Sequence, residues 1–151
     1  MTENTNSKDQ SVSNTALMCF ELFCNAFGRS FNAAVLIEKY NIADKEPDLS
    51  TTLEIAEELD FEAEHRIISW DDLISIESFP CLAILKNGNS VIFDNIRDDS
   101  IYLIDPLSEK KKIILQREKL EKNWDGQLVL LKPQLYHPLL RGFVMIGKHH
   151  G

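Results

Sequence analysis

The sequence predicts an α+β domain in which N-terminal helices pack on one side of an antiparallel β-sheet. Before Phe61, apolar residues recur every three or four positions, which is the period of an α-helix. From Phe61 onward, apolar and polar residues alternate, as they do in a strand with one solvated face. The Asn87-Gly88 pair between two apolar runs adds a strong hairpin signal. Helices that precede the strands as a separate group are typical of the α+β class.

Three helices are predicted in the first part of the chain. The first begins after an N-cap at Ser13 or Asn14, ends at Gly28, and has an apolar face formed by Leu17, Phe20, Cys24 and Phe27. The second covers 32–39, where a run of four apolar residues predicts nearly complete burial. The third opens at Ser50 or Thr51 and has an inner face of Leu53, Ala56 and Leu59. Thr51 and Glu54 have the spacing of a capping box.

The second part of the chain reads as short strands joined by turns. A strand over 61–67 is followed by a helical turn over 70–74, and a hairpin joins strands at 80–85 and 90–95. Further strands are predicted at 101–104, 112–115 and 127–131, with a short helix over 116–124. We therefore place the domain at residues 14–132. Residues 1–13 are a polar, flexible arm, and 133–151 are expected to be a linker towards a transmembrane domain that the sequence does not include.

Composition excludes several classes of function. With 24 acidic and 16 basic residues among 151, the formal net charge is −8, which argues against nucleic acid and against anionic membrane surfaces as partners. Three cysteines without C-x-x-C spacing indicate a reducing compartment, and the polar N-terminus does not have the pattern of a signal peptide. No pattern of metal ligands or phosphate loop occurs in the predicted domain, so we expect no cofactor.

Few residues of the predicted domain suit nucleophilic catalysis. Cys19 and Cys24 fall within the first helix and Cys81 within an apolar strand, so core packing is the favoured role for each. His65 is the one histidine inside 14–132, and a single strand histidine is more often structural than catalytic. Three large aromatic residues are candidates either for partner contacts or for the core, namely Trp70, Tyr102 and Trp124.

Several short segments, in order, resemble the bacteriocin-processing cysteine peptidases of family 39, which cut after a double glycine. The family's Asp-Cys-Gly opening of the first helix corresponds to Asn14-Thr15-Ala16-Leu17, and Phe27 takes the place of an aromatic at the helix end. The family's proline-containing strand, its Gly-x-His and its Asp-Pro correspond to Phe79–Ile84, Gly88-Asn89-Ser90 and Ile104-Asp105-Pro106. Those peptidase domains are papain-like and stand at the N-termini of ABC exporters.

The resemblance implies a domain that has lost its chemistry. Thr15 stands where the family has its cysteine nucleophile and Ser90 where it has its histidine base, whereas Asp105 is retained. A threonine hydroxyl without a neighbouring base is a poor nucleophile, so the resemblance predicts no peptidase activity. Inactive relatives of this kind are N-terminal domains of type I exporters of RTX toxins and adhesins.

By the same resemblance, the domain recruits or tethers an unfolded RTX-type substrate on the cytoplasmic side of the bacterial inner membrane. Its other expected partners are the exporter's own transmembrane and nucleotide-binding domains and the membrane-fusion protein of the secretion system. Candidate contact residues are the basic and aromatic side chains Arg97, Tyr102, Lys110, Lys111 and Lys112. Two alternatives remain open at this point: a free-standing papain-like scaffold or regulatory binding protein, and an active hydrolase that uses Cys19 or Cys24.

Overall fold

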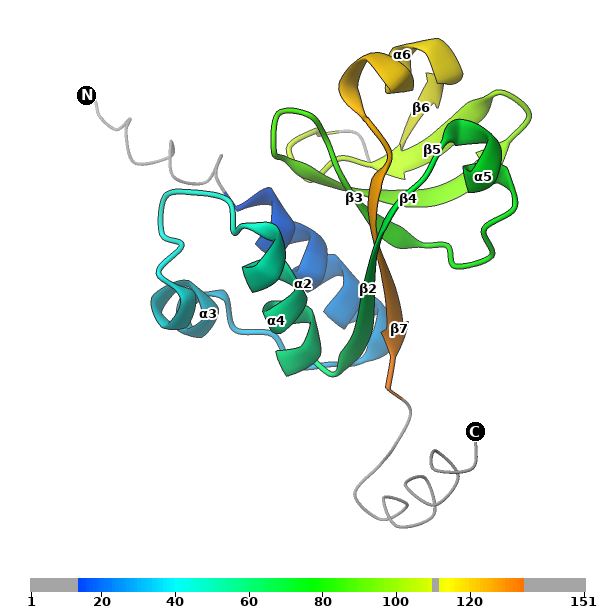
Figure 1. Ribbon diagram of the computed structural model, residues 1–151. Coiled ribbons are helices and arrows are strands. Elements are labelled where there is room, and N and C mark those ends of the chain that lie inside the picture. Colours follow the sequence, from blue (N-terminus) through cyan, green and yellow to red (C-terminus); the bar gives the residue numbers. More distant parts are fainter. Residues whose placement is uncertain (1–13, 110–111, 135–151) are drawn as a thin grey trace, which may run out of the picture.

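A computed structural model describes residues 14–109 and 112–134, and within these ranges five helices pack on a six-stranded antiparallel sheet (Figure 1). The helices are α2 (Thr15–Phe27), α3 (Ala33–Tyr40), α4 (Leu49–Glu58), α5 (Trp70–Ile74) and α6 (Arg117–Asn123). The strands are β2 (Phe61–Ile67), β3 (Cys81–Ile84), β4 (Ser90–Arg97), β5 (Ser100–Ile104), β6 (Ile113–Gln116) and β7 (Gln127–Pro133). The α+β class is thus confirmed. The predicted arm at 1–13, nearly all of the predicted linker, Lys110 and Lys111 lie outside the described residues.

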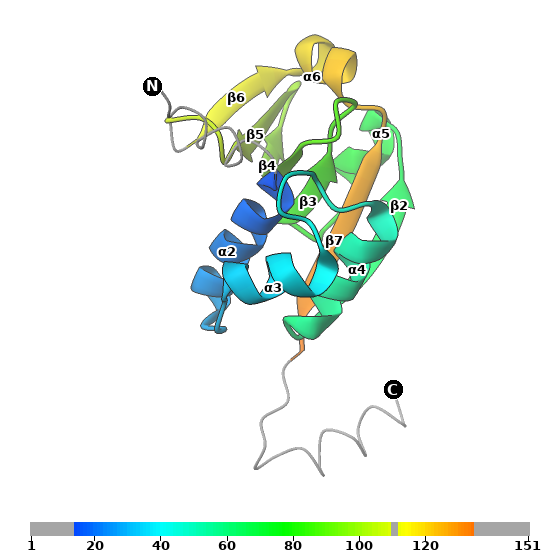
Figure 2. The ribbon, with the colours of Figure 1, turned by 90° about the vertical axis from the view of Figure 1, so that its left-hand side faces the viewer.

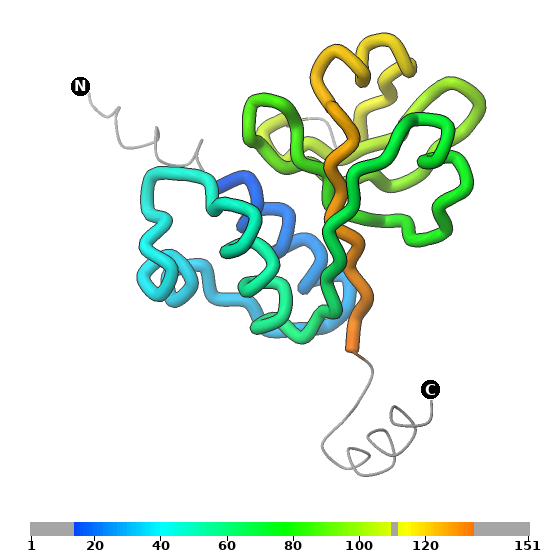
Figure 3. The backbone as a smooth tube through the Cα atoms, in the orientation of Figure 1, coloured from blue at the N-terminus to red at the C-terminus, as the bar shows by residue number. Residues whose placement is uncertain are grey.

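The sheet is more than a meander, because the last strand enters its interior. The strand order is β2-β7-β3-β4-β5-β6, so β7 separates β2 from β3 and pairs with both. Figure 3 shows the two chain segments β2 and β7 running side by side over their whole length. The strands β3, β4, β5 and β6 follow one another as antiparallel neighbours, in agreement with the hairpin signal at Asn87-Gly88.

The N-terminal helices α2, α3 and α4 share one face of the sheet, as predicted, and the two short helices α5 and α6 cover the other face. One core joins α2, α3 and α4 to inward residues such as Leu82 and Val129. The second core joins α5 and α6 to their strand neighbours Cys81, Ala83, Leu128 and Leu130. Adjacent residues of one strand point to opposite faces, so the two cores lie on either side of β3 and β7. Figure 2 shows α2, α3 and α4 grouped together, away from α6.

Asn14 occupies the predicted N-cap position of α2, whereas α4 begins at a different cap from the one predicted. Asn14 does precede α2, but its backbone is left-handed with φ 84°, and its side chain makes no capping bond to the helix. Helix α4 is capped by Asp48, which accepts a hydrogen bond from the Thr51 amide at 2.8 Å, and not by Ser50 or Thr51. A carboxylate at this position also interacts favourably with the helix dipole.

Helix α3 is much less buried than its apolar run predicts. Leu36 is the one residue of α3 with a fully buried side chain, whereas Val35 is 53% exposed. The helix begins one residue after the predicted start, because the Asn32 side chain caps it by accepting from the Val35 amide. A short run of apolar residues is compatible with a helix, but it does not show which faces of that helix pack against the rest of the domain.

Candidate functional site

Thr15 and Ser90, the two residues predicted to stand at degenerate catalytic positions, meet in the structure. Thr15 is the first residue of α2 and Ser90 the first of β4, and both are buried. The Ser90 backbone N–H donates a hydrogen bond to the Thr15 hydroxyl oxygen at 2.7 Å. Residues 75 positions apart in the chain are thereby brought into direct contact, because α2 packs across the start of β4. Ser90 thus offers Thr15 a backbone donor, and a serine hydroxyl is no general base at neutral pH.

A third residue, Glu46, completes this contact from the loop between α3 and α4. Its Oε2 accepts a hydrogen bond from the Thr15 hydroxyl and another from the Thr15 amide, both at 2.6 Å. Its Oε1 accepts from the Ala16 amide at 3.2 Å. The carboxylate thus occupies the N-terminal end of α2, where free amides and the helix dipole favour an anion.

Sequence reasoning did not single out Glu46. It lies in a segment that the sequence marks only as a loop, and 31 residues separate it from Thr15. The usual signal for a carboxylate at a helix start is a capping residue adjacent in sequence, and that position is held by Asn14, which has no capping bond. The sequence offers Asn14 as an ordinary N-cap, so it carries no signal that a distant carboxylate takes this role.

The loop that carries Glu46 is fixed on both sides. The Asn14 side-chain amide donates to the Ile42 carbonyl oxygen at 2.7 Å, and the Ile42 side chain is buried in the core. At the other end, Asp48 caps α4. The left-handed backbone of Asn14 turns its side chain away from α2 and towards this loop, which leaves the helix start to Glu46.

Asp105 follows β5 and organises its own turn. Its Oδ1 accepts from the Leu107 amide at 2.9 Å, and its carbonyl oxygen accepts from the Ser108 amide at 3.0 Å. Its charge nevertheless reaches the first helix. The pKa of the Cys19 thiol is raised well above its ordinary value by burial first, then by the negative charges of Glu46 and Asp105.

The three cysteines are buried and unpaired, as the sequence predicts for core residues. Burial raises the pKa of the Cys81 thiol to about 12. Burial also raises the pKa of Cys24, partly opposed by the Arg29 guanidinium. Reactive thiols have lowered pKa values and solvent access, so the alternative of a hydrolase built on Cys19 or Cys24 finds no support. His65 is the one histidine within the described ranges, and its Nε2 lies 3.0 Å from the Gln127 side-chain oxygen.

The predicted contact residues form no single basic patch within the described range. The exposed Arg97 guanidinium lies over the Tyr102 ring, 5.4 Å from its centroid. Lys112 pairs with Asp94 at 2.8 Å, so its charge is partly neutralised. The two tryptophans are buried and belong to the second core: Trp70 is the first residue of α5, and Trp124 follows α6.

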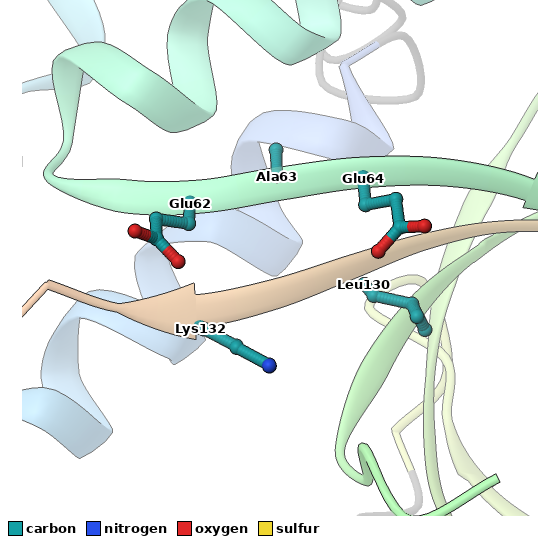
Figure 4. Close-up of a pocket in the computed structure, with 5 residues that line it drawn as sticks. All are labelled: Glu62, Ala63, Glu64, Leu130 and Lys132. Carbon is teal, nitrogen blue, oxygen red and sulfur yellow. The ribbon is translucent and has the colours of Figure 1, made fainter. Parts of the chain in front are cut away.

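A shallow hollow lies on the β2–β7 part of the sheet (Figure 4). It has a volume of about 190 Å³ and is lined by Glu62, Ala63, Glu64, Leu130 and Lys132. Figure 4 shows the side chains of Glu62 and Glu64 directed to one side of β2 and Ala63 to the other. None of these residues belongs to the Thr15–Ser90 contact, so this hollow is a separate surface feature.

The fold therefore sets the start of α2 against the start of β4, with helices packed on an antiparallel sheet. The model of the peptidase C39 family matches residues 5–135, and the chain belongs to this family. The resemblance noted from the sequence is thereby confirmed at the level of family and fold. No curated protein sequence matches the chain.

Solved structures agree with this assignment of the fold. The chain is similar to the N-terminal peptidase C39 like domain of the toxin secretion ATP-binding protein from Vibrio parahaemolyticus. The TM-score is 0.69 at 18% identity over 81% of this chain and 98% of that one. It is also similar to a double glycine motif protease from an AMS/PCAT transporter in complex with its leader peptide (TM-score 0.70, 14% identity, 80% and 85% covered). A third similar structure is the peptidase domain of Streptococcus ComA, a bi-functional ABC transporter (0.68, 17%, 85% and 94%).

Within the described ranges, no helix is both long and apolar enough to span a bilayer. The same residues hold no group of three or more histidine, cysteine, aspartate or glutamate side chains suited to a metal ion.

Proposed function

We propose that this chain is a catalytically inactive C39 domain of a type I secretion ABC exporter, which recruits or tethers an unfolded RTX-type polypeptide. The observation that carries the proposal is the state of Thr15. Its side chain is fully buried, and its hydroxyl already donates to Glu46 and accepts from the Ser90 amide. A nucleophile needs a free lone pair, access to the substrate and a base that takes its proton.

The carboxylate of Glu46 does not replace the missing histidine. Its two oxygens already accept hydrogen bonds from the Thr15 and Ala16 amides as well as from the Thr15 hydroxyl. The carboxylate is thereby held as the acceptor at the start of α2, with its oxygens engaged by the backbone. Thr15 therefore serves as a structural hydrogen-bonding residue, and Ser90 and Asp105 support the fold around it.

The assignment to an exporter is supported by the proteins with the same fold. One of them belongs to a toxin secretion ATP-binding protein, and another was solved with a leader peptide bound. We infer that this chain uses its fold in the same setting, at the cytoplasmic side of the bacterial inner membrane. There it works beside the transmembrane and nucleotide-binding domains of its exporter and the membrane-fusion protein. The alternative of a free-standing scaffold has no observation in its favour.

Substrate contact has to overcome an unfavourable net charge. RTX repeats are rich in aspartate, and a chain of charge −8 repels them at long range. Arg97 and Tyr102 offer a cationic group stacked on an aromatic ring at one end of the β4–β5 pair. A guanidinium–aromatic pair binds carboxylate and peptide groups of an extended chain together, so we place the contact here.

Fluorescence anisotropy tests this role. An RTX-repeat polypeptide kept unfolded by a calcium chelator is titrated with the chain, and we expect saturable binding with a dissociation constant of about 1–100 μM. Arg97→Ala weakens binding at least about threefold, because a rim charge contributes on the order of 1 kcal/mol. Arg66→Ala on β2, which also removes one exposed arginine, leaves it unchanged. Absence of binding at several hundred micromolar, which corresponds to a binding free energy weaker than about −4 to −5 kcal/mol, would contradict the recruiting role.

A further inference from the structure

Glu46 fills the place in which a peptidase of this architecture needs free hydrogen-bond donors. In serine and cysteine peptidases, the backbone N–H of the nucleophile helps to hold the oxyanion that forms on the substrate carbonyl. Here the Thr15 amide donates to Glu46 at 2.6 Å, and the next amide, that of Ala16, donates at 3.2 Å. A substrate carbonyl would have to displace a charged group of the chain itself.

Glu46 also opposes the ionisation of any nucleophile at position 15. A helix start and the Ser90 amide, both present here, favour a thiolate. The Glu46 Oε2 lies 2.6 Å from the Thr15 hydroxyl oxygen and places a negative charge against the same point. Its influence extends one turn further along α2, where it contributes to the raised pKa of Cys19.

We propose that Glu46 is a built-in blocking residue of the degenerate cleft, holding the first amides of α2 and keeping position 15 un-ionised. This inference rests on the proposed function, because it takes position 15 as the former nucleophile. It means that restoring cysteine at Thr15 and histidine at Ser90 is not sufficient for peptidase activity. Glu46 is the third position that separates this chain from an active enzyme.

Contacts at both ends of its loop hold Glu46 in place. Its loop is fastened at Ile42, whose carbonyl oxygen accepts from Asn14, and at Asp48, which caps α4. Asn14 in turn leaves the helix start uncapped by its own side chain. The neighbouring contacts thus hold Glu46 against the start of α2.

The test measures the pKa of a thiol introduced at position 15. The variants are Thr15→Cys, the double variant with Glu46→Gln, and a control double variant with Glu57→Gln, which neutralises an exposed glutamate of α4. Carbamidomethylation by iodoacetamide is followed by peptide mass spectrometry against pH, so that the buried native cysteines are counted separately. We expect the Thr15→Cys thiol to have an apparent pKa above the ordinary value of about 8.5. Glu46→Gln lowers it by about one unit, and Glu57→Gln leaves it unchanged.

Two outcomes of this titration overturn the proposal: equal pKa values with and without Glu46→Gln, or a Thr15→Cys thiol that ionises below about 8. The pKa of the Thr15→Cys thiol in the single variant requires no substitution at Glu46. It therefore tests the proposal even where the double variant does not fold. The proposed function fails differently, through cleavage by the unmodified chain. Cleavage of a double-glycine leader peptide by Thr15→Cys/Ser90→His alone contradicts the block but leaves the inactivity of the natural chain intact.

Discussion

Removal of the Glu46 carboxylate is expected to destabilise the whole domain. In Glu46→Ala, the amides of Thr15 and Ala16 lose their acceptor, and these residues are 0% and 1% exposed. A hydrogen bond to a charged acceptor contributes about 1.5–3 kcal/mol, and loss of an N-cap costs about 0.5–2 kcal/mol. Glu46 itself is half-buried, so water replaces part of what is lost. We therefore expect a loss of about 2–3 kcal/mol in the free energy of unfolding.

Urea unfolding followed by circular dichroism measures this loss. With an m-value of about 2 kcal/mol/M, the midpoint falls by about 1–1.5 M while m stays constant. Glu57→Ala removes the same charge from an exposed position of α4 and is expected to change stability by less than about 0.5 kcal/mol. A Glu46→Ala midpoint equal to that of Glu57→Ala refutes the reasoning, because the contact at the start of α2 would then contribute nothing.

Three further predictions follow from single contacts. Gly126→Ala places a Cβ 2.3 Å from the Ile68 carbonyl oxygen at φ 105° and costs at least about 3 kcal/mol. Gly88→Ala is the control: at φ 93° its Cβ meets nothing within 4 Å, and we expect a cost of about 1–2 kcal/mol. Equal losses of stability for the two variants in thermal unfolding would refute the clash at Gly126. Burial raises the pKa of the Cys81 thiol to about 12, above its value in the unfolded chain. The neutral thiol therefore contributes fully to the free energy of unfolding below about pH 9, and this contribution is lost as the pH rises from about 9 to about 12. Cys81→Ala therefore flattens the decline of the urea midpoint over that range; an unchanged decline contradicts this.

Local signals in the sequence predicted the elements well. The hairpin followed from Asn87-Gly88, where Gly88 has the positive φ of 93° that such a turn requires. The strand over 61–67 and the helical turn over 70–74 have the predicted bounds, since alternation and a local N-cap at Ser69 define them. These features depend on neighbours in the chain, which is why the sequence alone carries them.

The features that the sequence did not predict depend on distant residues. Because β7 lies between β2 and β3, residue 61 pairs with residue 133, and no local sequence pattern predicts this pairing. The apolar runs of β3 and β7 face two cores, so the sequence marks them as buried without showing that helices cover both sides. The Glu46 contact is of the same kind, because its partners are fixed only when the loop meets α2.

The order of short family-like segments singles out Thr15 and Ser90, which periodicity alone does not. The structure places the Ser90 amide nitrogen 2.7 Å from the Thr15 hydroxyl oxygen, and the assignment of the two residues to former catalytic positions stays a prediction. The contact surface was harder to predict, since exposed basic residues leave no periodic signal. Lys112 proves to be paired with Asp94, whereas Arg97 lies on Tyr102.

The central claim is that a buried hydroxyl, bonded to Glu46 and to the Ser90 amide, leaves this C39 domain without peptidase chemistry. Overnight incubation of the chain with a double-glycine leader peptide, followed by mass spectrometry, tests it most directly. The account predicts that the peptide remains intact. Cleavage after the glycine pair that disappears in Thr15→Ala would contradict it.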